Sequence, residues 1–353
     1  MGRHPQPTEY LESMTQSAAV APVADAKALF RQISVHASPA FWRSLGELAL
    51  TLGPLVLLLG VTLAAVNAGY WIALLLTVPA GAFLMRLFMI QHDCGHGSYF
   101  RTRRANDWVG RVIGLLTLTP YEYWRRSHAE HHARNGHLDH RGMGDILTLT
   151  AREYRNMSSF RRLLYRLYRN PLVMFGLGPA FIFLIQFRLP IGLMKGGREP
   201  WVSTMASNLV LAAIAGAMMW FGVLGLFLLV YVPAVVVAAT GGVWMFYVQH
   251  QFEDARWSCN ETWSFHDAAL HGSSHYDLPP LLRWLSANIG IHHIHHLASR
   301  IPFYRLSKVL RERPELRHVS RLTLRQSFAT VKLKLWDEDS QRLITFREAR
   351  AAA

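Results

Sequence analysis

Residues 45–66 read LGELALTLGPLVLLLGVTLAAV, an apolar run in which Glu47 is the single charged residue. After a break of three residues, a second apolar run covers residues 70–90, with Arg86 as its single charge. About 20 apolar residues at a helical rise of about 1.5 Å each match the hydrocarbon thickness of a bilayer. The short break between the two runs therefore predicts a hairpin of two membrane-spanning helices.

A second pair of apolar runs lies at 204–221 and 223–248, separated by Gly222 and free of charged residues. Soluble domains rarely need two such pairs, so the pattern predicts an all-α integral membrane protein with four transmembrane helices in two hairpins. Two further apolar stretches, 109–120 and 171–187, are too short or too interrupted by Gly and Pro to span. We expect interfacial or re-entrant helices there.

Positive charge lies between the apolar runs rather than within them. The chain has 37 Lys and Arg against 23 Asp and Glu, a formal net charge of +14. Because two hairpins with short outer turns leave both termini on one side, the positive-inside rule places that side in the cytoplasm. The first 44 residues contain no apolar stretch typical of a cleaved signal peptide. We expect a single domain over residues 1–353, composed of a cytosolic segment 1–44, a hairpin 45–90, a cytosolic segment 91–203, a hairpin 204–248 and a cytosolic segment 249–353.

Composition excludes several classes of protein. At 51% hydrophobic residues, the chain is too apolar to be disordered. Cys94 and Cys259 are too few for a disulfide framework, a four-cysteine zinc site or an iron–sulfur cluster. Basic clusters at 101–104, 125–126 and 161–169 suit anionic lipid headgroups, with the docking of an acidic partner as the alternative. We expect no nucleic-acid partner for a chain embedded in lipid.

Eighteen histidines are present, and none lies within a predicted span. Residues three and four apart share one face of a helix, so histidines with this spacing can converge on one point. One catalytic metal takes three or four protein ligands, so eight or nine converging imidazoles predict a histidine-rich di-metal site in a cytosolic helical cap. Imidazole binds iron, zinc, copper and nickel, so the ligand type leaves the metal open. The candidates are His92 and His96; His128, His131 and His132; His292, His295 and His296; and His250 as a ninth.

The other histidines lack this spacing. On a helix His293 points about 100° away from His292, so we exclude it from the ligand set. Surface or supporting roles are expected for the histidines of polar, loop-like stretches, which are His137, His140, His266, His271 and His275.

The three histidine groups resemble the three histidine boxes of the integral-membrane fatty acid desaturases, H-x3-H, H-x2-H-H and H-x2-H-H in that order. The resemblance covers residues 86–304 and is closest to the bacterial acyl-lipid desaturases. The similar runs around the boxes are HDCGHGS at 92–98, LD at 138–139, RG at 141–142, GDI at 144–146, YVQH at 247–250, FED at 252–254, NIG at 288–290 and RIP at 300–302.

This resemblance implies two iron ions held by the eight box histidines, and His250 matches a further metal-binding histidine near the last span of related membrane desaturases. It also implies an O2-dependent oxidoreductase of a bacterial inner membrane that introduces a cis double bond into a fatty acyl chain of a lipid. A metal centre is needed because no side chain abstracts hydrogen from an unactivated C–H bond. The sequence shows no dinucleotide fingerprint and no cytochrome b5-like segment, so the resemblance implies a separate electron donor such as a ferredoxin or flavodoxin.

Two sets of neighbours are candidates for supporting roles. Polar side chains near the boxes could orient the ligand rings through their free N–H groups; they are Asp93, Glu130, Glu253, Asp254 and Asn288. Aromatic side chains near the span ends could line a slot for an acyl chain, although such residues are also typical of cores and interfacial belts. They are Trp71, Phe88, Trp108, Tyr121, Trp124, Trp244 and Phe246.

Three alternatives remain at this point. A lipid hydroxylase or ketolase would share the boxes, because no residue separates the insertion of oxygen from the loss of two hydrogens. A histidine-rich metal transporter or sensor would place its ligands along a path inside the spans, whereas these lie at the span ends. A bis-histidine haem protein needs facing histidines within a helix bundle and fits the pattern poorly.

Overall fold

The computed structural model describes residues 26–142 and 144–351, and the chain there is mostly helical. Four helical segments are long and apolar enough to cross a membrane, in agreement with the four spans that the sequence predicts. They are α3 (Phe41–Asn67), the 3-10 turn η2 (Trp71–Leu76) continued by α4 (Thr77–His96), α10 (Arg198–Trp220) and α11 (Leu224–His250).

Two of these helices continue beyond their apolar runs. The apolar sequence ends near residues 90 and 248, but α4 runs on to His96 and α11 to His250. Gly97, with a left-handed φ of 66°, ends α4. The first histidine pair and His250 therefore stand on rigid extensions of the long helices rather than on loops.

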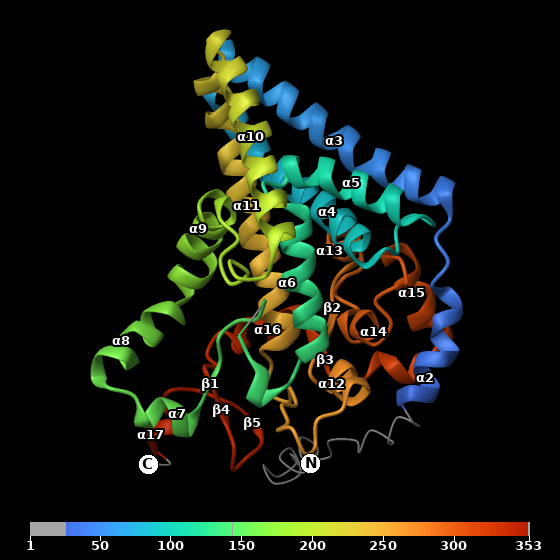
Figure 1. Cartoon of the computed structure of the whole chain (residues 1–353), viewed down its shortest axis with the longest axis vertical. Helices are drawn as coiled ribbons and strands as arrows, with labels where there is room; N and C mark the ends of the chain where they lie inside the picture. The colour runs from blue at the N-terminus through green and yellow to red at the C-terminus, as the bar shows by residue number, and fades with distance from the viewer. Residues whose placement is uncertain (1–25, 143, 352–353) are drawn as a thin grey trace, which may run out of the picture.

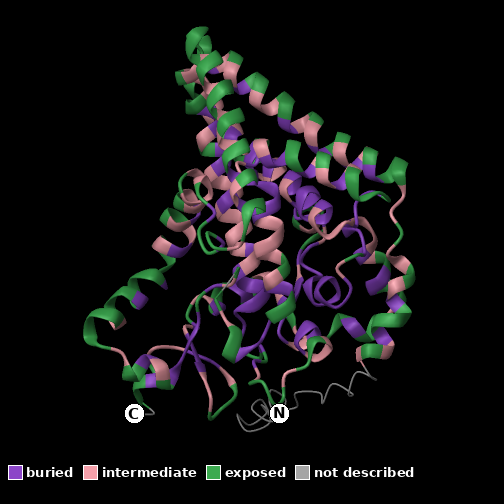
Figure 2. Cartoon of the chain, viewed as in Figure 1, coloured by how far each residue is buried: buried purple, intermediate pink, exposed green. Residues whose placement is uncertain are grey.

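The long helices and the short elements occupy opposite ends of the molecule. Figure 1 shows α3, α10 and α11 meeting at one end, while α2 (Ala26–Ile33), the short helices and the strands gather at the other. Exposed residues cover much of the long helices, and buried residues concentrate where these helices enter the other half (Figure 2). Since many of the exposed side chains on α3 and α10 are large and apolar, a lipid environment accounts for this surface.

α4 is the central helix, packed against both α3 and α11. The approach to α11 is close at Gly81, where an added Cβ would lie 2.6 Å from Cβ of Val237. Leu84, Leu87 and Ile90 continue the buried face of α4 toward its histidines.

Shorter helices surround the ends of α4 and α11. They are α5 (Arg103–Leu116), α6 (Tyr121–Arg134), α7 (Ala151–Asn156), α8 (Ser159–Tyr168), α9 (Gly178–Leu184), α12 (Phe265–His271), α13 (Pro280–Leu285), α14 (His292–Leu297), α15 (Phe303–Glu312), α16 (Leu324–Thr330) and α17 (Glu348–Ala351). Single turns complete them: η1 (Ser34–His36), η3 (Leu138–His140), the π-helical η4 (Val173–Leu177), η5 (Gln186–Arg188) and η6 (Pro314–Arg317).

The two short apolar stretches do not form straight spans. The first begins within α5, which stops at Leu116, so its last residues lie beyond the helix. The second is divided among η4, α9 and η5, and this segment bends by 56° relative to α8. The broken course agrees with the expectation of an interfacial or re-entrant segment at 171–187.

The end of the molecule where the short helices and the strands gather, which we call the cap, is not purely helical, and this corrects the all-α expectation. One sheet has the order β1-β4-β5, formed by Leu149–Thr150, Leu335–Asp337 and Arg342–Ile344. In the other, β2 (His275–Asp277) pairs in parallel with β3 (Arg321–Thr323). Strands of two or three residues are too short to leave an alternating pattern, and β1 pairs with a strand far along the chain, so no local pattern predicts them.

The two lone charges of the first apolar pair meet inside the protein. Arg86 on α4 forms an ion pair with Glu47 on α3, and both side chains are buried. Nε of Arg86 also donates to Thr51 Oγ1 at 3.1 Å, and its guanidinium lies 4.3 Å from the ring centroid of Trp284 on α13. This pair therefore joins two long helices to the cap.

We predict that Glu47→Leu lowers the free energy of unfolding by about 3 kcal/mol or more, because it leaves the Arg86 charge buried without a counterion. The double variant Glu47→Leu/Arg86→Leu should recover most of the loss, since it removes both charges together. Thermal unfolding of the purified protein in detergent measures both changes. A double variant as unstable as the single one would show that the charge pair is not the cause.

Candidate metal centre

Four helices bring the nine candidate histidines to one place. α4 contributes His92 and His96, α11 contributes His250 at its last turn, and the two trios lie on α6 and α14. All nine are at least half-buried. The spacing of three and four residues within each helix turns the rings toward a common volume, as expected from helix geometry.

The nine rings form two clusters, in each of which the potential ligand atoms lie within 4.8 Å of one another. The first cluster comprises His92, His96, His128, His132 and His295. The second comprises His131, His250, His292 and His296. Each trio is divided between the clusters, because neighbouring residues on α6 and on α14 point to different sides.

The nitrogen positions fit metal coordination. Nε2 of His250 lies 3.0 Å from Nε2 of His292, and Nε2 of His128 lies 3.1 Å from Nε2 of His96. Two imidazole nitrogens bound to one metal at about 2.1 Å are about 3.0–3.4 Å apart at tetrahedral or right angles. The donor sets of five and four rings therefore suit one ion each.

The two clusters are adjacent. The rings of His132 and His296, one from each cluster, are stacked with centroids 4.1 Å apart. An ion in one cluster would therefore lie next to an ion in the other, which is the arrangement that a di-metal centre requires.

Burial keeps five of the clustered rings uncharged at neutral pH. The pKa values of five cap histidines lie well below the usual range, first because burial disfavours the charged form and second because neighbouring histidines repel added protons. They are His128, His132, His292, His295 and His296. At neutral pH these rings offer free lone pairs, the state that metal binding needs.

Three groups orient the ligand rings through Nδ1. Asp145 contacts Nδ1 of His131, and Oδ1 of Asp93 lies 3.3 Å from Nδ1 of His92. The carbonyl oxygen of Gly272 lies 3.2 Å from Nδ1 of His250. Asp93 was among the polar candidates, whereas Asp145 was missed, although it lies in the GDI run that follows the second box.

The other four polar candidates make their contacts elsewhere. Glu130 pairs with Arg134, and Glu253 pairs with Arg342. Asn288 donates to the carbonyl of Phe303 at 3.3 Å and also contacts Ser307, while Asp254 is exposed in the turn after α11. Closeness to the histidine boxes in the sequence therefore did not predict contact with the histidine rings for these four residues.

The remaining histidines in the part of the chain that the structure describes lie outside both clusters. The rings of His137 and His140 pack on each other, and His271 lies beside Asp267. Nε2 of His293 lies 3.0 Å from the carbonyl oxygen of Leu316, and Nδ1 of His275 lies 2.8 Å from that of Arg317. These contacts agree with their exclusion from the ligand set.

A cavity of about 560 Å³ reaches the clusters. Its walls come from α4, α6, α11 and the bent segment of η4 and α9, and they are mainly apolar. His92, His128 and His292 form part of the lining, so the cavity touches both clusters. Such a cavity can hold a long apolar ligand beside the potential metal ligands.

Three of the seven aromatic channel candidates line this cavity: Phe88, Trp124 and Phe246. Trp124 also stacks on His128, with ring centroids 4.6 Å apart. The other four do not line it. Trp71 and Trp108 are largely exposed, and Trp244 donates from Nε1 to the hydroxyl of Tyr276 at 3.3 Å.

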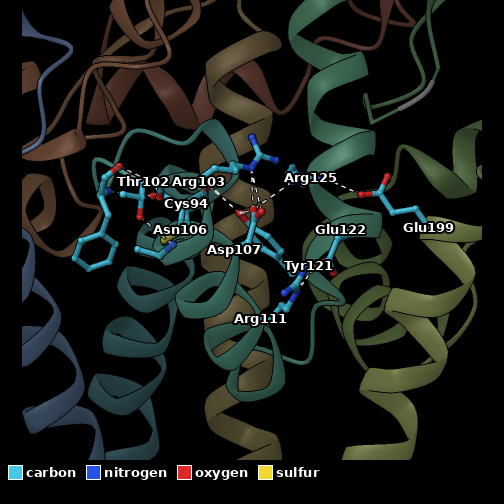
Figure 3. Close-up of polar contacts among 12 residues, drawn as sticks. Cys94, Thr102, Arg103, Asn106, Asp107, Arg111, Tyr121, Glu122, Arg125 and Glu199 are labelled. Atoms are coloured by element: carbon cyan, nitrogen blue, oxygen red, sulfur yellow. Dashed lines mark hydrogen bonds and ion pairs between the residues drawn. The ribbon is translucent and has the colours of Figure 1, made fainter.

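Tyr121, the fourth, belongs to a polar network that fixes the start of α6 (Figure 3). Its hydroxyl donates to the carbonyl of Cys94 at 2.8 Å and to Asp107 at 3.1 Å. Asp107 also accepts from Arg103 at 2.9 Å and from Arg125 at 3.2 Å. The network ties α5 and α6 to the end of α4, so Tyr121 supports the helices that carry the histidines rather than the cavity.

Comparison with known proteins agrees with this geometry. A family model described as fatty acid desaturase matches residues 68–327. Over 322 residues the chain is 42% identical to a protein of Bacillus subtilis (strain 168) named fatty acid desaturase, with 91% of each chain covered. It is 29% identical over 286 residues to the sn-1 acyl-lipid omega-3 desaturase (ferredoxin) of Synechocystis sp., covering 76% of this chain and 74% of that protein.

A second Synechocystis protein, sn-1 oleoyl-lipid 12-desaturase, is 29% identical over 274 residues, covering 70% of this chain and 72% of that protein. The region matched by the family model includes all nine clustered histidines. With its four apolar helices and this match, the chain belongs to the fatty acid desaturase family and is an integral-membrane oxidoreductase.

Proposed function

We propose that this protein is an acyl-lipid desaturase that introduces a cis double bond into a fatty acyl chain with the help of two iron ions. The observation that carries the proposal is the apolar cavity, whose wall contains histidines of both clusters. The reaction removes two hydrogens from adjacent methylenes, and with O2, two electrons and two protons it yields the alkene and two water molecules.

The cavity supplies the binding site for the acyl chain. Leu84 and His92 both line it and lie eight residues apart on α4, which corresponds to about 12 Å along the helix. An extended hydrocarbon can therefore lie along α4 and α11 with one part beside the histidines. Apolar lining residues such as Phe183 and Val235 exclude water from this part of the chain.

The histidine clusters supply the metal ligands. We assign one iron to each cluster, held by five and four rings. Bound iron would supply the oxidising power that side chains lack. The protein's own contribution is to keep five of the rings neutral by burial and to orient three others through Asp145, Asp93 and the carbonyl of Gly272.

We further propose that the four long helices form two membrane hairpins, with the cap and both termini in the cytoplasm of a bacterial cell. The excess of Lys and Arg outside the apolar runs supports this orientation. The electrons would come from a separate donor, such as a ferredoxin or flavodoxin. The printed name of one relative includes ferredoxin, which supports that assignment.

Expression in a bacterial host without desaturases tests the function itself. We expect membrane lipids of the host to gain a monounsaturated acyl chain, identified by gas chromatography and mass spectrometry. The His295→Ala variant, which removes a ring of the first cluster, should give none. A hydroxylated or oxo-acyl product would instead favour the hydroxylase or ketolase alternative.

Metal analysis tests the ligand assignment. Purified protein should contain about two irons per chain, since each cluster has enough rings for one ion. His250→Ala should release one of its two irons to a chelator more readily than the wild-type protein does, because the second cluster is reduced from four rings to three. His271→Ala serves as the control and should keep both irons, and the opposite pattern would remove His250 from the ligand set.

Asp145, whose carboxylate contacts Nδ1 of His131, provides a second test of the ligand assignment. We expect Asp145→Asn to weaken metal binding by about 10- to 100-fold, because a neutral amide orients the ring less firmly. Chelator competition followed by metal analysis measures the affinity. Glu130→Gln is the matched control, since its carboxylate pairs with Arg134 instead. Equal losses in both variants would show that the contact with His131 does not matter.

A further inference from the structure

Helix α8 has an unusual exposed face. Its sequence, SFRRLLYRLY, places Phe160, Leu163, Leu164 and Leu167 on one stripe at helical spacing. These side chains are half to two-thirds exposed, whereas Tyr165 on the opposite side is buried and donates its hydroxyl to the carbonyl of Lys334 at 2.6 Å. The helix is therefore anchored by one face and leaves an apolar face uncovered.

Positive charge surrounds this apolar stripe. Residues 151–170 contain six arginines and a single acidic residue, Glu153, which pairs with Arg141. Arg166 packs against Tyr154, and Arg169 is buried, whereas Arg161 is exposed and Arg162 half-buried. An amphipathic helix with arginines beside an exposed apolar stripe fits the surface of an anionic bilayer.

The segment that follows α8 also exposes large apolar side chains. Leu172, Leu177 and Phe181 follow along η4 and α9, and all three are more than half exposed. Basic residues of α8 thus lie beside exposed apolar residues. This arrangement matches a bilayer surface, where charged headgroups lie beside the hydrocarbon.

The same helix ends at the opening of the cavity. Tyr168, the last residue of α8, lines the cavity and is partly exposed. Exposed lining residues also come from the loops after α6 and after η5, at Gly144 and Gly192. These residues mark where the cavity meets its surroundings. The arginines of α8 therefore lie on the helix that ends at the proposed entrance for an acyl chain.

From these contacts we infer that α8 binds the headgroups of anionic phospholipids at the cavity opening, so that acyl chains of anionic phospholipids are the preferred substrates. This inference rests on the proposed desaturase function. Each arginine near an anionic surface favours the lipid by about fivefold. Losing Arg161 and Arg162 together should therefore reduce the preference by an order of magnitude.

The test uses the full-length protein in vesicles of phosphatidylglycerol or phosphatidylcholine with matched acyl chains. The wild-type protein should desaturate phosphatidylglycerol at least about tenfold faster, and Arg161→Gln/Arg162→Gln should lose this difference while keeping its rate on phosphatidylcholine. The control Lys308→Gln/Arg311→Gln removes the same charge from two exposed positions of α15 and should keep the difference. Equal rates of the wild-type protein on both lipids would overturn the inference.

A second measurement does not depend on turnover. A fluorophore attached to Leu164→Cys, in a Cys259→Ser background, should be quenched more strongly by brominated phosphatidylglycerol than by brominated phosphatidylcholine. The arginine variant should abolish the difference. This result would support the binding of headgroups even if no unsaturated product formed, so failure of the proposed function can be distinguished from failure of the inference.

An acidic protein is the competing occupant of α8. In that case the arginine variant would lose turnover equally on both lipids and would recover it with excess electron donor. Lack of quenching by either brominated lipid would place α8 in water. Either outcome would overturn the assignment to anionic lipid.

Discussion

Nine imidazole rings share one small volume, and burial keeps the five of them on α6 and α14 whose pKa values are lowered uncharged at neutral pH. If the buried cap histidines carried protons, mutual repulsion would separate α6 from α14, and their low pKa values avoid this. Metal binding would stabilise the arrangement further, since the converging nitrogen lone pairs of each cluster would bind the ion. The rest of the structure can be understood as a frame that holds four helix ends around these rings.

Polar contacts join the long apolar helices to the cap at several points. The buried pair of Glu47 and Arg86 links α3 and α4 to α13, and Asp107 ties α5 and α6 to the end of α4. Because α4 and α11 pass without a break from the apolar half into the cap, the cavity between them extends from apolar side chains to the histidines. The same two helices thus carry both potential metal ligands and walls of the proposed acyl site.

Much of this arrangement could be predicted from the sequence, because long apolar runs and histidines at helical spacing are local patterns. The four long helices and the convergence of the nine histidines follow from them. The division of each trio between two clusters depends on how α6 faces α14, which no local pattern encodes. The short strands, the role of Asp145 and the position of Tyr121 outside the cavity likewise depend on contacts between distant segments.

The central claim is that each histidine cluster holds one iron ion and that the two ions lie side by side at the wall of the cavity. Anomalous X-ray diffraction at the iron edge, from crystals of protein purified with its metal, tests this most directly. We expect two peaks per chain, one among His92, His96, His128, His132 and His295, and one among His131, His250, His292 and His296. A single peak, or iron bound away from these rings, would contradict it.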